Sequence, residues 1–177
     1  MGVGPVIDAR GSDSGQLDNA LELLQESGRD LLHSMQMLVP PAWEEDAALP
    51  PAQRAWCEYH AGIIEPWDGP AALVFSDGRI VGAALDRNGL RPARYLLTSQ
   101  GMLVLASEAG VVDSEAHEVV EKGRLGPGEM LAVDLARGVL LRNAEIKAAL
   151  ATRQPYQQWI DNYLLHLSDL SLVGATV

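Results

Sequence analysis

Hydrophobic residues recur at helical spacing in the first third of the chain. In the stretch LDNALELLQESG, Leu17, Leu21 and Leu24 are separated by polar residues, and this spacing places them on one face of an α-helix. Gly28 follows and is a suitable residue to end the helix. At its start, just before Leu17, the predicted helix has three residues that commonly cap helices: Ser12, Asp13 and Ser14. The pattern therefore predicts a helix between these caps and Gly28.

Four further segments are predicted as helices. The second runs over about residues 29–38 and ends before Pro40, and the third covers about 51–63 with Pro51 in its first turn. Towards the end of the chain, the segments 143–152 and 155–167 have helical patterns again.

Strand patterns occupy the middle of the chain. AALVFSDGRIVGAALD predicts a β-hairpin that turns at Asp77-Gly78, and RYLLTSQGMLVLASE predicts another that turns near Gly101. Both are rich in small and β-branched residues, as in buried sheets. Two more strands are expected at 130–134 and 139–142. Helices, then antiparallel strands, then helices predict an α+β fold, and 177 residues predict a single domain.

Composition and charge exclude several classes of protein. The net charge is −11, and such a field repels nucleic acid and anionic membranes, so neither is an expected partner. No apolar run approaches the roughly 18 residues of a membrane helix, and the N-terminus lacks the pattern of a signal peptide. The chain has one cysteine, which rules out an internal disulfide and favours a reducing cytoplasm.

Candidate chemistry in the helical region starts with Cys57. His60 follows it by three positions in AWCEYH, so the two could share a helix face as nucleophile and base. The simpler interpretation, which we favour, is a small buried residue on an amphipathic helix. None of the four histidines has metal-ligand spacing to another, and no metal site is expected.

Two polar motifs remain open on the residues alone. Asp13, in GSDSGQLDN, can cap backbone N–H groups or can present its carboxylate to a cationic ligand, and spacing favours capping. The stretch LDRNGLRPARY places Arg87, Arg91 and Arg94 in an acidic protein. Composition alone allows an anion site there, with phosphate as the obvious ligand.

Read in order, five segments resemble one family. GSDSGQLDNALELL, EPWDGPAAL, DRNGLRPARY, ASEAGVVD and KGRLGPGEMLAVDL are similar to the class II glutamine amidotransferase domain of the glutamate synthase large subunit, over residues 5–159. The resemblance implies an N-terminal-nucleophile hydrolase fold, an αββα sandwich of antiparallel sheets that this chain completes only in part. The implied activity is hydrolysis of L-glutamine to glutamate and ammonia, which then serves glutamate formation from 2-oxoglutarate.

The resemblance also implies roles for particular residues. Asp13 matches the aspartate that holds the substrate α-amino group, with Ser12 and Ser14 orienting it, which reverses the preference for capping. The basic stretch becomes a structural corner near the pocket, turned by Asn88-Gly89. Its arginines Arg87, Arg91 and Arg94 are then expected to pair with acids such as Asp86 and Glu108.

The family nucleophile is an N-terminal cysteine whose free amine is the base, and this chain has no match for it. Cys57 is internal and cannot replace it. We therefore expect the C-terminal portion of the domain, inactive alone, with the remainder of the glutamate synthase large subunit as its partner. No cofactor is expected in this chain; FMN and an iron–sulfur cluster belong to the full-length family enzyme. The alternative is a non-catalytic amidotransferase-like domain that binds glutamine or mediates interactions.

Overall fold

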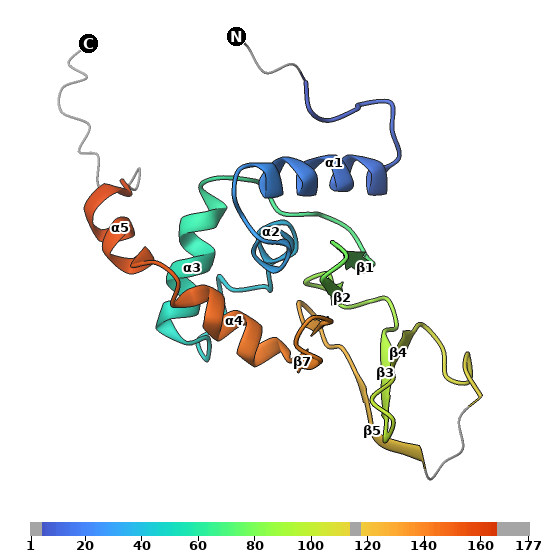
Figure 1. Cartoon of the computed structure of the whole chain (residues 1–177). Coiled ribbons are helices and arrows are strands. Elements are labelled where there is room, and N and C mark those ends of the chain that lie inside the picture. Colours follow the sequence, from blue (N-terminus) through green and yellow to red (C-terminus); the bar gives the residue numbers. More distant parts are fainter. Residues whose placement is uncertain (1–4, 114–117, 166–177) are drawn as a thin grey trace, which may run out of the picture.

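The computed structural model describes residues 5–113 and 118–165, and within them the chain forms five helices and two antiparallel sheets (Figure 1). The helices are α1 (Asp13–Glu26), α2 (Leu31–Leu38), α3 (Pro51–Ala61), α4 (Asn143–Ala151) and α5 (Tyr156–Tyr163). The strands are β1 (Ala72–Ser76), β2 (Ile80–Leu85), β3 (Arg94–Thr98), β4 (Leu103–Ala106), β5 (Val119–Arg124), β6 (Met130–Asp134) and β7 (Val139–Leu141). The α+β class predicted from the sequence is confirmed.

Side-chain caps set the starts of the first two helices. The Ser12 hydroxyl accepts from the Gly15 amide at the start of α1. Asp30 accepts from the His33 amide, so α2 begins at Leu31 and not at residue 29 as predicted. At the other end, α5 stops at Tyr163 instead of reaching residue 167.

Both predicted hairpins form, and they belong to different sheets. β1 and β2 pair around Asp77-Gly78 within a four-stranded sheet of order β1-β2-β6-β7. β3 and β4 pair around Gly101 within a three-stranded sheet of order β4-β3-β5. Strand β5 was missed by the sequence analysis. Its residues alternate between half-buried and exposed positions, and the cations Lys122 and Arg124 weaken its apolar pattern.

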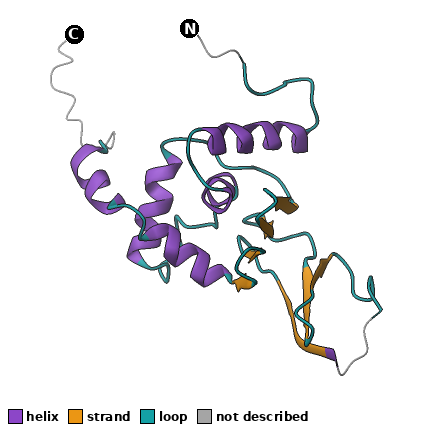
Figure 2. Cartoon of the chain, viewed as in Figure 1, coloured by secondary structure: helices purple, strands orange, loops and turns teal. Residues whose placement is uncertain are grey.

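The helices cover one face of the four-stranded sheet. Phe75, Met130 and Ala132 of this sheet join the larger core with helix residues such as Met35 and Leu150. Its other face packs against the three-stranded sheet in a smaller core that includes Ala83, Leu85, Leu131, Ala93 and Leu125. Figure 2 shows the five helices on one side of the strands, with β3, β4 and β5 extending away from them. The order of layers is therefore helices, sheet, sheet.

The sheet-to-sheet packing is incomplete on the β1 side. Val74 is 72% exposed and Leu135 is 55% exposed, although both stand on the face of the four-stranded sheet that points away from the helices. With Val81 they border an apolar hollow of about 320 Å³. The expectation that these strands are buried is thus wrong for this edge. No described helix is long and apolar enough to cross a membrane.

Candidate functional site

The first candidate site is the start of α1. Ser12 is the N-cap, and its Oγ lies 3.2 Å from the Ser14 Oγ and 3.2 Å from the Gly15 amide that donates to it. Asp13 occupies the first turn and is exposed. Within residues 5–113 and 118–165 its carboxylate has no hydrogen bond or ion pair. Since Ser12 provides the cap, Asp13 keeps its charge available at the positive end of the helix dipole.

The second candidate site is the corner between β2 and β3, where Asp86 is only 1% exposed. Its Oδ1 accepts from the Ala71 amide at 3.0 Å, and its Oδ2 accepts from the Asn88 amide at 2.7 Å. Its backbone carbonyl accepts from the amides of Gly89 and Gly128. Asp86 therefore joins the corner to the start of β1 and to the Gly126–Gly128 loop.

Gly89 turns the chain in this corner, as the Asn-Gly pair predicted. Its φ is +62°, which side-chain-bearing residues rarely adopt. A Cβ at this position would lie 2.9 Å from the Pro127 Cα. The corner thus needs glycine both for its conformation and for its close approach to the neighbouring loop.

The arginines of the corner do not form the expected ion pairs with Asp86 and Glu108. Arg87 pairs instead with Asp68, at 3.3 Å between Nη2 and Oδ1. Arg91 and Arg94 have no acidic partner in the part of the chain that the structure describes. Asp86 is unavailable because backbone amides occupy its oxygens.

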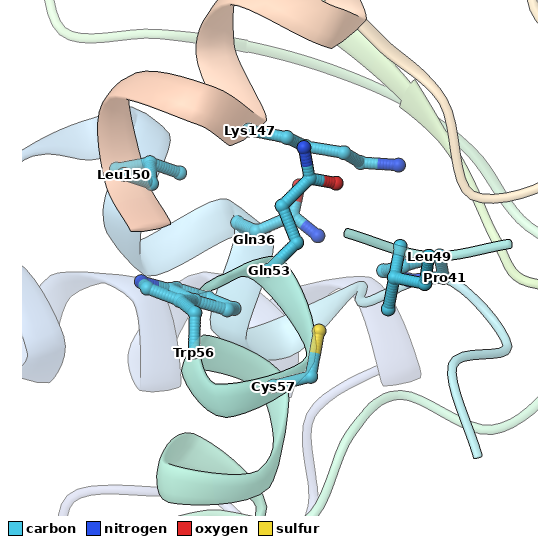
Figure 3. Close-up of a pocket in the computed structure, with 8 residues that line it drawn as sticks. All are labelled: Gln36, Pro41, Leu49, Gln53, Trp56, Cys57, Lys147 and Leu150. Carbon is cyan, nitrogen blue, oxygen red and sulfur yellow. The ribbon is translucent and has the colours of Figure 1, made fainter. Parts of the chain in front are cut away.

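Cys57 faces the interior of the helical layer. It is a buried free thiol, and burial raises its pKa to about 12. Its sulfur points towards a cavity of about 10 Å³, shown in Figure 3, which is about the size of one water molecule. The Lys147 amine at the same cavity donates to the Gly128 carbonyl at 2.8 Å. Burial, a raised pKa and so small a space leave the Cys57 thiol without the exposure that reactive cysteines have.

His60 does not serve as a base for Cys57. Its Nδ1 donates to the Trp56 carbonyl at 2.7 Å, and its Nε2 lies 2.8 Å from the Nε2 of His33. Burial lowers the pKa of His60 to about 4. The structure therefore does not support a Cys–His pair and agrees with the interpretation favoured from the sequence, in which Cys57 is a buried residue on an amphipathic helix. A His–His pair joins α2 to α3.

The sequence analysis missed this histidine pair because the two residues are 27 positions apart. Only helix spacing could have hinted at it, since each lies on a helix face that carries core residues. Two nitrogens alone do not make a typical metal site. Among the described residues there is no group of three or more His, Cys, Asp or Glu side chains that could hold a metal ion.

Comparison with known proteins places these features in a family. The chain belongs to the class II glutamine amidotransferases, whose family model matches residues 1–159. It is 44% identical over 164 residues to the large chain of the NADPH glutamate synthase of Bacillus subtilis, covering 93% of this chain and 11% of the relative.

Two ferredoxin-dependent glutamate synthases are similar as well. The Synechocystis protein, ferredoxin-dependent glutamate synthase 2, is 53% identical over 158 residues, covering 88% of this chain and 10% of the relative. The chloroplastic ferredoxin-dependent glutamate synthase 2 of Arabidopsis thaliana is 43% identical over 176 residues, covering 98% of this chain and 11% of the relative. The chain thus spans about a tenth of the length of these relatives.

Proposed function

We propose that this chain forms part of the glutaminase domain of a glutamate synthase, where L-glutamine is hydrolysed to glutamate and ammonia. The observation that supports it is the Asp13 carboxylate, which is exposed at the start of α1 and has no partner among the described residues, while Ser12 caps the helix. A carboxylate in that setting can bind the α-ammonium of an amino acid through charge-assisted hydrogen bonds. Ser12 and Ser14 hold the backbone turn on which Asp13 stands.

In this proposal the reacting thiol comes from outside the 177 residues. The thiolate of an N-terminal cysteine attacks the amide carbon of glutamine, ammonia leaves, and water then cleaves the thioester to glutamate. Cys57 does not take this role, because it is buried and its pKa is raised to about 12. FMN and the iron–sulfur cluster would likewise be bound by other parts of a cytoplasmic enzyme, with the ammonia used for glutamate formation.

Replacement of Asp13 in the complete domain tests the binding role. Asp13→Asn removes a charge-assisted interaction worth about 1.5–3 kcal/mol, so kcat/KM for glutamine should fall by roughly 10- to 100-fold. The loss should come mainly through KM, since the ammonium is held alike in ground and transition states. Asp18→Asn is the matched control, because Asp18 is also exposed on α1. Equal effects of the two variants would contradict the assignment.

The 177-residue chain alone should release no glutamate from glutamine, with or without Cys57→Ala. Glutamine turnover that disappears in Cys57→Ala would overturn the proposal and make Cys57 the nucleophile. Glutamine binding by the isolated chain, observed by calorimetry and lost in Asp13→Asn, would support a binding site that forms without the nucleophile. If glutamine binds equally well to that variant, Asp13 is not the contact.

A further inference from the structure

Three arginines near the β2–β3 corner have no acidic partner in the part of the chain that the structure describes. Five other arginines form ion pairs with Asp or Glu. Arg91, Arg94 and Arg124 form none within the described part of the chain, although the protein carries a net charge of −11. Arg29, Arg54 and Arg137 also lack a carboxylate partner among the described residues, but Arg91, Arg94 and Arg124 differ from them because they lie together at one hollow.

The three side chains border one hollow of about 340 Å³. Arg94 on β3 and Arg124 on β5 are direct cross-strand partners, an arrangement in which like charges destabilise a sheet. Arg91 approaches from the corner itself. The other lining residues are Gly89, Leu90, Pro92, Ala93, Leu125, Gly126 and Pro127, so no acidic residue borders the hollow.

Two nearby carboxylates accept from backbone amides, and two others, Glu108 and Asp113, line a different hollow with Arg94 but form no ion pair with it within the described residues. Asp86 is saturated by the amides of Ala71 and Asn88. Glu129, in the adjoining loop, accepts from the Gly126 amide through Oε2 at 2.7 Å. Neither is available to neutralise the arginines, so the repulsion between Arg94 and Arg124 remains uncompensated by the described chain.

We propose that Arg91, Arg94 and Arg124 form a binding site for a small multivalent oxyanion, a phosphate or a di- or tricarboxylate. The planar guanidinium group matches both kinds of oxyanion through paired hydrogen bonds. The hollow has the volume of a small-ligand site, whereas the net charge of the protein disfavours a nucleic acid. This site is distinct from the one proposed at Asp13, because the Asp13 carboxylate would bind a cationic group of its ligand.

Thermal unfolding of the 177-residue chain with added anions tests the site. Inorganic phosphate or citrate should raise the unfolding midpoint in a saturable manner, and sodium chloride at equal ionic strength should not. The anion whose effect on the unfolding midpoint saturates at the lower concentration shows whether the site prefers phosphate or carboxylate. Arg124→Gln should abolish the saturable rise. Without added anion, this variant should unfold at the same temperature as the parent or higher, because the like-charge pair is gone.

Arg137→Gln is the matched control, since Arg137 is exposed in the β6–β7 turn, away from the hollow. It should keep the full response to phosphate or citrate. An equal rise in Arg124→Gln would show a general salt effect and overturn the proposal. Titration calorimetry of the folded parent with each anion gives an independent answer, and failure of both anions to bind at millimolar concentration would also overturn it.

Discussion

At the scale of single residues, the His33–His60 contact defines the protonation state of both rings. The Trp56 carbonyl can only accept, so His60 Nδ1 carries a proton and its Nε2 is left as the acceptor for His33. Protonation of His60 would place two N–H groups face to face. Burial lowers the pKa of both rings, and Arg153 and Arg29 near His33 act in the same direction, while Asp30 opposes them.

This pair should make the fold sensitive to mild acid. A histidine whose folded pKa is below its unfolded value of 6.5 costs nothing above pH 6.5 and destabilises the fold as the pH falls towards about 4. At about 1.4 kcal/mol per pKa unit, His60 would cost roughly 3 kcal/mol in full. Urea unfolding from pH 7.5 to 4.5 should show this loss, and His60→Gln should show a smaller one. If the free energy of unfolding falls equally steeply with pH in the parent and in His60→Gln, the acid sensitivity does not come from His60.

Residue-level chemistry was only partly predictable from the sequence. The motif GSDS identified a helix cap and a candidate ligand, but only the structure shows that Ser12 is the cap and that Asp13 has no partner within residues 5–113 and 118–165. The ion pairs expected of Asp86 do not form because the residue is buried and accepts from four backbone amides. Two of these amides, those of Ala71 and Gly128, are far away in the sequence. Local spacing carries no information about such contacts.

At the scale of elements, Gly89 tests how firmly the β2–β3 corner is held against the Gly126–Gly128 loop. Gly89→Ala should lower the free energy of unfolding by about 1–2 kcal/mol because alanine must adopt a left-handed backbone. The new Cβ also meets the Pro127 backbone, and this overpacking should cost a further 1–3 kcal/mol, roughly. Gly138 has a φ of +63° and nothing within 4 Å of its Cβ, so Gly138→Ala should incur only the backbone cost. Chemical denaturation of both variants measures the difference. Equal losses would mean that the corner relaxes freely.

The elements themselves were largely predictable where their signals are local. Asp77-Gly78 and Gly101 mark the hairpin turns, and the hairpins form there. The division of the strands between two sheets was not evident, because β2 pairs with β6 across some fifty residues. Strand β5 was not predicted because half of its positions are exposed and two of these, Lys122 and Arg124, are charged. Its pairing with β3, and not its composition, makes it a strand.

At the scale of the whole molecule, the uncovered apolar part of the four-stranded sheet's face should cause self-association of the isolated chain. Val74, Val81 and Leu135 border the hollow there, and exposed apolar strands invite pairing with other chains. Val74→Thr should lower the weight-average mass in sedimentation experiments. Val120→Thr, also a change at an exposed strand valine but outside this hollow, should not. A stable monomer with a cooperative melt at high temperature would contradict this expectation.

The family was recognisable from the sequence because its motifs occur in order along nearly the whole chain, and the comparisons confirm it. The sequence raised an anion site at the β2–β3 corner, but the place of Arg124 in the hollow and the histidine pair could not be predicted, since each joins residues from separate elements.

The buried thiol of Cys57 offers a practical consequence for studies of this molecule. It is the only cysteine, and it lies 5% exposed within the helical core. A thiol-specific reagent can reach it only when α3 separates from its neighbours. The rate at which Cys57 is modified therefore measures how often the helical core opens by local unfolding, and no added label is needed.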